Sequence, residues 1–312
     1  MKPFAFVFPG QGSQSVGMLD AWGDHPAVAQ TLAEASEALH EDLGRLIHEG
    51  PKEALALTVN TQPAMLVAGI AAYRAWVHET GQEPAMVAGH SLGEYSALVA
   101  AGALTLADAV PLVRFRAAAM QEAVPAGQGA MAAILGMPAD QVKAICAQCM
   151  AATGEVAEAV NFNDPAQTVI AGSKAGVDKA CEMLKAAGAK RALPLPVSAP
   201  FHSSLMRPAA ERLREKLATV TLASPRIRLV NNIDAGFETE PERIRDVLFR
   251  QAFGAVRWVE CVQAIKAAGI FDVVECGPGK VLAGLVKRID AELRGAAVHD
   301  PASLAEVKGA LQ

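Results

Sequence analysis

The sequence lacks a long hydrophobic run, an excess of basic residues and any block of one charge. No stretch of about 18 apolar residues free of charge occurs in the 312 residues, so we expect no membrane span. The formal net charge is -5, which argues against nucleic-acid binding because such proteins usually need a basic face. The apolar run Phe4–Phe8 near the N-terminus is too short for a secretory signal. These absences predict a cytoplasmic protein.

Cysteine is scarce and odd in number, which argues against a framework of paired disulfides. The five cysteines are at positions 146, 149, 181, 261 and 276. Cys146 and Cys149 have the C-x-x-C spacing, but no second ligand pair lies nearby to complete a zinc site. The pair also falls inside a helical pattern rather than at its start, where a thioredoxin-like motif would lie. Buried, reduced thiols are the favoured interpretation, and we expect no metal.

The segment Gly89-His90-Ser91-Leu92-Gly93 carries the strongest signal in the chain. It lies between a short apolar run at 85–88 and a helix-like run at 94–101. Glycine-x-serine-x-glycine between a strand and a helix is typical of a nucleophile elbow. The glycines allow the backbone to approach closely, and the helix N-terminus offers N–H groups to a developing oxyanion. A tight turn with a capping serine is the alternative interpretation.

Strand-like apolar runs alternate with helical patterns along the chain, which indicates an α/β protein. The expected strands are 4–8, 85–88, 228–230 and 271–275, and the expected helices are about 26–40, 62–79, 94–101, 105–123, 206–219, 242–251 and 258–268.

One segment follows its own order of elements. It is expected to contain strand 130–135, helix 139–151, strand 160–163, strand 168–171, helix 175–187 and strand 191–197. This β-α-β-β-α-β order is typical of a ferredoxin-like unit. We therefore expect residues 126–198 to form a small subdomain inserted into a body made of 1–125 and 199–312. A cleft between the two would be the natural ligand site.

A catalytic serine needs a base, and His202 is the best candidate among the seven histidines. It lies in a loop segment, 197–204, where the small unit returns to the body, and cleft-edge loops often carry function. A capping or structural role for His202 is the alternative. The glycine-rich segment 10–14 follows the first strand, but Ser15 replaces the third glycine of a dinucleotide loop. A second interpretation places Gln11 near the serine as a donor.

Five motifs together resemble one enzyme family. They are Gly10-Gln11-Gly12-Ser13-Gln14, Gly89-His90-Ser91-Leu92-Gly93-Glu94, Asn161-Phe162-Asn163, Pro200-Phe201-His202 and Glu275-Cys276-Gly277-Pro278-Gly279-Lys280. In this order they resemble the malonyl-CoA:acyl carrier protein transacylases and, more distantly, the acyltransferase domains of polyketide synthases. The likeness runs from about residue 4 to 290. It implies an α/β-hydrolase-like body with a ferredoxin-like insertion.

The resemblance also implies a role for particular residues. It implies Ser91 as nucleophile, His202 as base, the N–H groups of Gln11 and Leu92 as oxyanion hole, and the main-chain carbonyl of Gln251 as the group that orients the histidine.

An arginine after the elbow is expected to bind the malonyl carboxylate. Arg114 and Arg116 point roughly 200° apart on a helix, so only one can face the cleft. The motif match selects Arg116, whose planar fork suits a carboxylate. Phe201, before the histidine, resembles the residue of malonyl-selective synthase domains and should leave less room for an α-methyl branch.

The function implied is ping-pong transfer of malonyl from malonyl-CoA to the phosphopantetheine thiol of holo acyl carrier protein in fatty acid biosynthesis. A malonyl-serine intermediate carries the group, and no cofactor is implied. We expect a monomer, since no coiled-coil pattern occurs. Candidate basic contacts for an acidic carrier are Lys190, Arg191, Lys280, Lys287 and Arg288.

Three alternatives are kept open. A transacylase of a polyketide or malonate-utilising pathway would share every motif. A serine esterase or thioesterase would share the elbow, but it predicts an acidic triad partner and has no need of Arg116. A noncatalytic carrier-docking module predicts a missing serine or histidine, and both residues are present.

Overall fold

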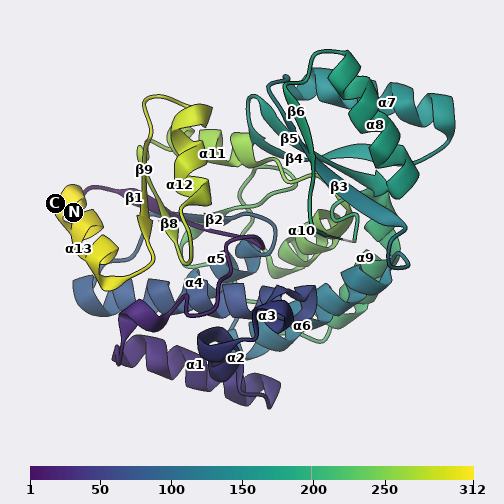
Figure 1. Cartoon of the computed structure of the whole chain (residues 1–312). Helices are drawn as coiled ribbons and strands as arrows, with labels where there is room; N and C mark the ends of the chain where they lie inside the picture. Colours follow the sequence, from purple (N-terminus) through teal and green to yellow (C-terminus); the bar gives the residue numbers. More distant parts are fainter. Residues whose placement is uncertain (198) are drawn as a thin grey trace.

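The described part of the chain, residues 1–197 and 199–312 of a computed structural model, contains two β-sheets surrounded by helices (Figure 1). The larger sheet has the strand order β7-β2-β1-β8-β9, and every neighbouring pair is parallel. Its strands are β1 (Phe4–Phe8), β2 (Met86–Gly89), β7 (Arg228–Val230), β8 (Asp272–Cys276) and β9 (Arg294–Val298). The smaller sheet is antiparallel, so the fold is mixed α/β.

Four of the parallel strands lie within one residue of their predicted positions, whereas β9 is absent from the prediction. Its sequence, Arg294-Gly295-Ala296-Ala297-Val298, has a single β-branched residue and therefore low strand propensity. Pairing with β8 holds it in the sheet. Tertiary context, rather than local preference, makes this strand.

Helices cover both faces of the parallel sheet. The three phenylalanines of β1 pack on one face against α4 (Thr58–Thr80), where the rings of Phe6 and Trp76 are 5.5 Å apart. Val7 points to the opposite face, toward α11 (Trp258–Ala267) and α12 (Val281–Ile289). Each fully buried phenylalanine contributes about 1.5–3 kcal/mol. Burial on both faces explains why β1 is apolar throughout.

The other helices lie mainly beneath the parallel sheet in Figure 1 or at its ends. They are α1 (Pro26–Leu39), α2 (Leu43–Glu49), α3 (Lys52–Ala56), α5 (Gly93–Ala100), α6 (Leu106–Glu122), α9 (Arg207–Leu217), α10 (Pro241–Phe253) and α13 (Pro301–Leu311), with short 3-10 helices η1 (Asp20–Trp22) and η2 (Ser204–Met206). The sequence prediction omits α2, α3, α12 and α13.

The smaller sheet has the order β4-β5-β3-β6. In chain order its elements are β3 (Gly129–Leu135), α7 (Ala139–Thr153), β4 (Ala157–Asp164), β5 (Gln167–Ser173), α8 (Lys174–Ala186) and β6 (Arg191–Pro194). Both helices pack on one face (Figure 1), around a core that includes Ile134 and Val142. The opposite face carries Met131 and Val160, which pack with Phe201 of the body.

The last strand of this sheet ends at Pro194, not at Val197 as predicted. Proline has no N–H to donate to a ladder, which weakens pairing at that point. The predicted end of the inserted unit, residue 198, lies outside the described residues. The division into 126–198 and a body of 1–125 and 199–312 stays a prediction.

Strand β4 is hydrogen-bonded to the segment between α10 and α11. The N–H of Phe162 donates to the carbonyl of Val256 over 3.0 Å, and the N–H of Val256 donates to the carbonyl of Val160 over 2.8 Å. Just after β2, His90 Nε2 lies 2.8 Å from Asn163 Oδ1 of β4, so the small sheet meets the carboxyl end of β2, where parallel sheets commonly bind ligands.

Neither a membrane-spanning helix nor a metal-binding cluster occurs among residues 1–197 and 199–312. No helix there is long and apolar enough to cross a bilayer, and no three histidine, cysteine or acidic side chains gather as metal ligands. All five cysteines are free thiols. Cys146 and Cys149 are buried in α7, and burial raises the pKa of Cys146 to about 12. Both therefore serve as core residues.

Candidate active site

The turn between β2 and α5 places Ser91 at the carboxyl end of the parallel sheet. Ser91 has a φ of 53°, a left-handed conformation that non-glycine residues rarely adopt. A Cβ on Gly89 would lie 1.9 Å from the carbonyl of Gly93, and one on Gly93 would lie 2.0 Å from the carbonyl oxygen of Phe8. Only glycine fits at either position, so the spacing of the motif makes the sharp turn possible.

Ser91 and His202 form a hydrogen-bonded pair. Ser91 Oγ lies 2.7 Å from His202 Nε2, and His202 Nδ1 lies 2.8 Å from the main-chain oxygen of Gln251. A carbonyl only accepts, so Nδ1 carries the proton and Nε2 is left to accept from the hydroxyl. Within the described ranges no carboxylate contacts the ring, and the carbonyl occupies the place of a triad acid.

The surroundings of His202 keep its ring neutral. Its side chain is buried, and burial first, then the positive charge of Arg116, lowers the pKa of His202 to about 3. A folded pKa below the ordinary value means that the imidazole stays unprotonated as the pH falls through 6.5. The His202 ring can therefore still accept a proton in mildly acidic solution.

This predicts an unusual pH profile for acylation of Ser91. Between pH 6 and pH 5 a histidine with the ordinary pKa of about 6.5 would lose about eight-fold of its neutral form. We expect the second-order acylation rate to change less than about two-fold over that interval, measured by rapid quench at substrate below saturation. An eight-fold fall would contradict a neutral, buried base.

Arg116 brings a buried positive charge to the same place. Its Nη2 lies 3.2 Å from Ser91 Oγ and 3.0 Å from Gln251 Oε1, and its Nη1 lies 2.9 Å from Gln62 Oε1. The side chain is 1% exposed, and no carboxylate of residues 1–197 or 199–312 pairs with it. Its Nε also lacks a hydrogen-bond partner there. A desolvated, incompletely paired guanidinium suits an incoming anion.

Arg114 lies on the other side of the helix, as the 200° separation predicts. It forms two hydrogen bonds with the carboxylate of Glu41, at 3.1 and 2.9 Å. α6 thus directs one arginine to the surface and one to the serine. Pro111 lies inside α6.

A cavity of about 130 Å³ encloses Ser91, His202 and Arg116, and its wall includes the loops after β1 and β2 and residues of β3 and β4. Its lining comprises Gln11, Gln62, His90, Ser91, Leu92, Arg116, Met120, Met131, Asn161, Leu195, Val197, Phe201 and His202. A second cavity of about 300 Å³ shares Gln11, His90, Asn161 and Leu195 with it. The first is large enough for a small acyl group, and the second adjoins it and is lined by both polar and apolar side chains.

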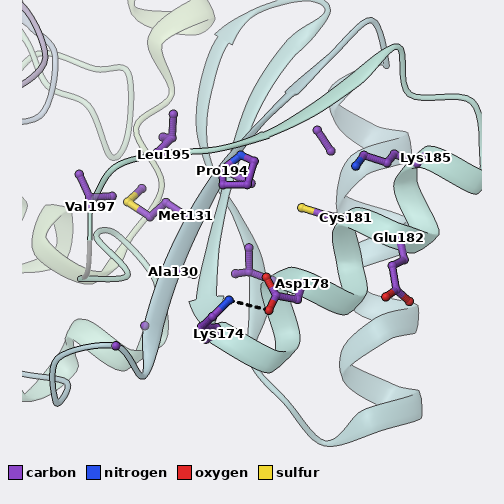
Figure 2. A pocket seen from close by; sticks show the side chains of 15 residues that line it. Ala130, Met131, Lys174, Asp178, Cys181, Glu182, Lys185, Pro194, Leu195 and Val197 are labelled. Carbon is purple, nitrogen blue, oxygen red and sulfur yellow. Dashed lines mark hydrogen bonds and ion pairs between the residues drawn. The ribbon is translucent and has the colours of Figure 1, made fainter.

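A third cavity, of about 450 Å³, lies on the small sheet beside α8 (Figure 2). It shares Met131, Leu195 and Val197 with the serine cavity. Lys174 and Asp178 on its floor pair with each other at 2.8 Å, so that their charges are mutually satisfied. Ser91 and His202 are absent from its lining.

Three residues missed by the sequence reasoning support the site. Gln62 is a buried glutamine in the largely apolar helix α4, and Glu94 is a buried acid in α5. Asn232 follows β7; its Oδ1 accepts from the N–H of Ser91 at 2.7 Å, and its Nδ2 donates to the carbonyl of Gly89 at 2.7 Å. Since Asn232 occupies the N–H of Ser91, an oxyanion must find other donors. The signal available in the sequence for such supporting residues was a polar residue within an apolar run.

The five basic residues suggested as carrier contacts fall in two places. Lys190 and Arg191 are at the start of β6, whereas Lys280, Lys287 and Arg288 belong to α12 or its N-cap. Arg288 pairs with Asp164 at 2.9 Å. The carrier contacts stay a prediction.

Comparisons with known proteins agree with one another. The family described as "Acyl transferase domain" matches residues 5–306. The malonyl CoA-acyl carrier protein transacylase of Escherichia coli K12 is 52% identical over 306 residues, which is 98% of each chain. That of Bacillus subtilis 168 is 46% identical over 97% of this chain and 96% of its own.

Solved structures of similar proteins also match nearly the whole chain. An acyl-carrier-protein S-malonyltransferase from Burkholderia pseudomallei superimposes with a TM-score of 0.96 at 63% identity, covering 98% of this chain and 99% of that chain. A malonyl-transacylase in complex with a type II PKS acyl-carrier protein has a TM-score of 0.95 at 48% identity, covering 97% of this chain and 98% of that chain.

Proposed function

Because the chain belongs to the acyl transferase family of the malonyl CoA-acyl carrier protein transacylases, we propose that it transfers malonyl from malonyl-CoA to the phosphopantetheine thiol of acyl carrier protein in fatty acid synthesis. One observation carries the proposal: a nucleophile, a base and a buried cation meet in one small cavity. A serine hydrolase would need the first two but not the cation.

Acylation follows from the pair Ser91 and His202. His202 Nε2 takes the hydroxyl proton as Ser91 Oγ attacks the thioester carbonyl. The N–H groups of Gln11 and Leu92, both in the cavity wall, would stabilise the oxyanion. As the tetrahedral intermediate collapses, the carbon–sulfur bond breaks and the proton on His202 passes to the sulfur of CoA. A malonyl ester remains on Ser91.

Transfer to the carrier reverses the same steps. The pantetheine thiol gives its proton to His202 Nε2, its sulfur attacks the ester carbonyl, and Ser91 Oγ leaves with the proton. The 300 Å³ cavity suits the approach of the pantetheine arm, because the side-chain amides of Asn161, Asn163 and Gln167 line it and can pair with the amides of that arm.

Selectivity for malonyl is assigned to two residues. Arg116 would hold the free carboxylate through its guanidinium, and the ester then lies between this anchor and the oxyanion donors. Phe201 lines the same cavity and narrows the space beside the α-carbon, so an α-methyl branch would clash.

The finer description of the fold rests on similar grounds. We infer an α/β-hydrolase-like body from the elbow after β2, and an inserted ferredoxin-like subdomain from the β-α-β-β-α-β order. We also expect a monomer, which light scattering of the purified chain would test.

Intact-protein mass after brief incubation with acyl-CoA tests the function. We expect one malonyl adduct, which peptide mapping places on Ser91 and which holo acyl carrier protein removes. Acetyl-CoA and methylmalonyl-CoA should give little adduct in the same time. Release of free malonate, with no malonyl carrier formed, would instead identify a thioesterase.

A further inference from the structure

A buried acid lies behind the cavity and has no part in the steps above. Glu94, in the first turn of α5, is 1% exposed. Its Oε2 accepts from Nε2 of Gln251 at 2.9 Å and from the N–H of Asn232 at 2.9 Å. Burying a carboxylate without hydrogen bonds costs free energy, so the two donors stabilise the buried side chain of Glu94.

The side-chain amide of Gln251 links this acid to Arg116. Its Nε2 donates to Glu94 Oε2 and to the main-chain oxygen of Ser91, at 2.9 and 3.0 Å. Its Oε1 accepts from Arg116 Nη2 at 3.0 Å. Two acceptors on one end of the amide oblige the oxygen end to face the guanidinium. The reversed amide would oppose N–H groups to N–H groups and leave buried donors unpaired.

We propose that Glu94 is a positioning residue of malonyl transfer, which through the amide of Gln251 holds the guanidinium of Arg116 beside Ser91. The inference rests on the function proposed above. Gln251 also orients His202, but through its main-chain oxygen rather than through the side-chain amide that Glu94 holds.

The charges around Glu94 agree with this arrangement. Burial raises the pKa of Glu94 to about 7, and the hydrogen bonds from Asn232 and Gln251 and the charge of Arg116 oppose that rise. The acid and the guanidinium therefore interact electrostatically across the intervening amide.

Replacing Glu94 distinguishes a role in positioning Arg116 from a role in protein stability alone. Glu94→Ala removes an acceptor of Gln251, and we expect malonyl acylation to fall about 100-fold. Acetyl acylation should fall less than about ten-fold because acetyl does not use Arg116. Glu94→Gln keeps an acceptor oxygen and should retain at least about a third of the wild-type malonyl-to-acetyl ratio. Single-turnover rates, normalised to the acyl-serine formed at the end point, provide the ratio.

Glu275→Gln is the matched control. Glu275 is a fully buried acid whose pKa burial also raises to about 7, but it bonds the N–H of Ala283 at 2.9 Å, away from Gln251. Glu275→Gln should leave the malonyl-to-acetyl ratio unchanged. If Glu94→Ala does not fold, Glu94→Asp takes its place. It shortens the side chain by one methylene and moves the carboxylate oxygens away from Gln251, so the malonyl-to-acetyl ratio should again fall.

An equal loss of malonyl and acetyl rates in Glu94→Ala would overturn the inference, as would a Glu94→Gln enzyme as unselective as Glu94→Ala. Absence of any malonyl adduct in the wild type would overturn the proposed function instead. The two failures are thus distinguished within one experiment.

Discussion

Ser91→Ala, His202→Ala and the double variant are each expected to lower the rate of malonyl transfer by about 10⁴-fold or more, and by similar factors. Ser91 Oγ and His202 Nε2 share one hydrogen bond of 2.7 Å and act in one step. Once either partner is lost, removing the other costs little further. Steady-state transfer from malonyl-CoA to holo acyl carrier protein measures the three losses.

Ser96→Ala is the matched control for this prediction. Ser96 is 1% exposed in α5, five residues after Ser91. It is absent from the wall of the serine cavity, so its loss should change the transfer rate less than about two-fold. Losses that multiply in the double variant would show that Ser91 and His202 act independently.

The turn that carries Ser91 and most of the strands of the parallel sheet could be predicted from the sequence because their signals are local. Gly89 and Gly93 encode a turn that a Cβ would forbid, and the apolar run of β1 encodes a strand buried on both faces. The two orientations of Arg114 and Arg116 follow from helical periodicity alone. None of these inferences needs knowledge of distant parts of the chain.

A polar residue within an apolar run marks such supporting residues as unusual, but their hydrogen-bond partners could not be predicted in this way. Gln62 is separated from Arg116 by 54 positions, and Asn232 from Ser91 by 141. Their neighbours in sequence are ordinary helix and loop residues, and only the packed fold brings the partners together. Strand β9 was not predicted for the same reason, because its alanines and glycine have no strand preference of their own. Hydrogen bonds between distant buried groups are properties of the tertiary structure.

Arg116→Ala is expected to erase the preference for malonyl-CoA over acetyl-CoA, a change of about two to three orders of magnitude in the ratio of acylation rates. Among residues 1–197 and 199–312, the guanidinium donates hydrogen bonds only to neutral groups, those of Ser91, Gln62 and Gln251. A malonyl carboxylate supplies the missing anion, and removal of one partner of such a buried pair costs about 3–5 kcal/mol. Acetyl has no carboxylate to lose.

Arg114→Ala provides the control for Arg116→Ala, because it removes the same side chain from the same helix. Arg114 pairs with Glu41 at the surface, and exposed pairs contribute at most about 1 kcal/mol, so the ratio should stay within about two-fold. Rates are compared at pH 8, where His202 is neutral with or without the neighbouring charge. A malonyl-to-acetyl ratio that survives Arg116→Ala would mean that another group binds the carboxylate.

Arg116→Lys tests the charge and the geometry of the side chain separately. Lysine keeps the positive charge but lacks the planar guanidinium that can make two parallel hydrogen bonds to a carboxylate. We expect a malonyl-to-acetyl ratio between those of the wild type and Arg116→Ala.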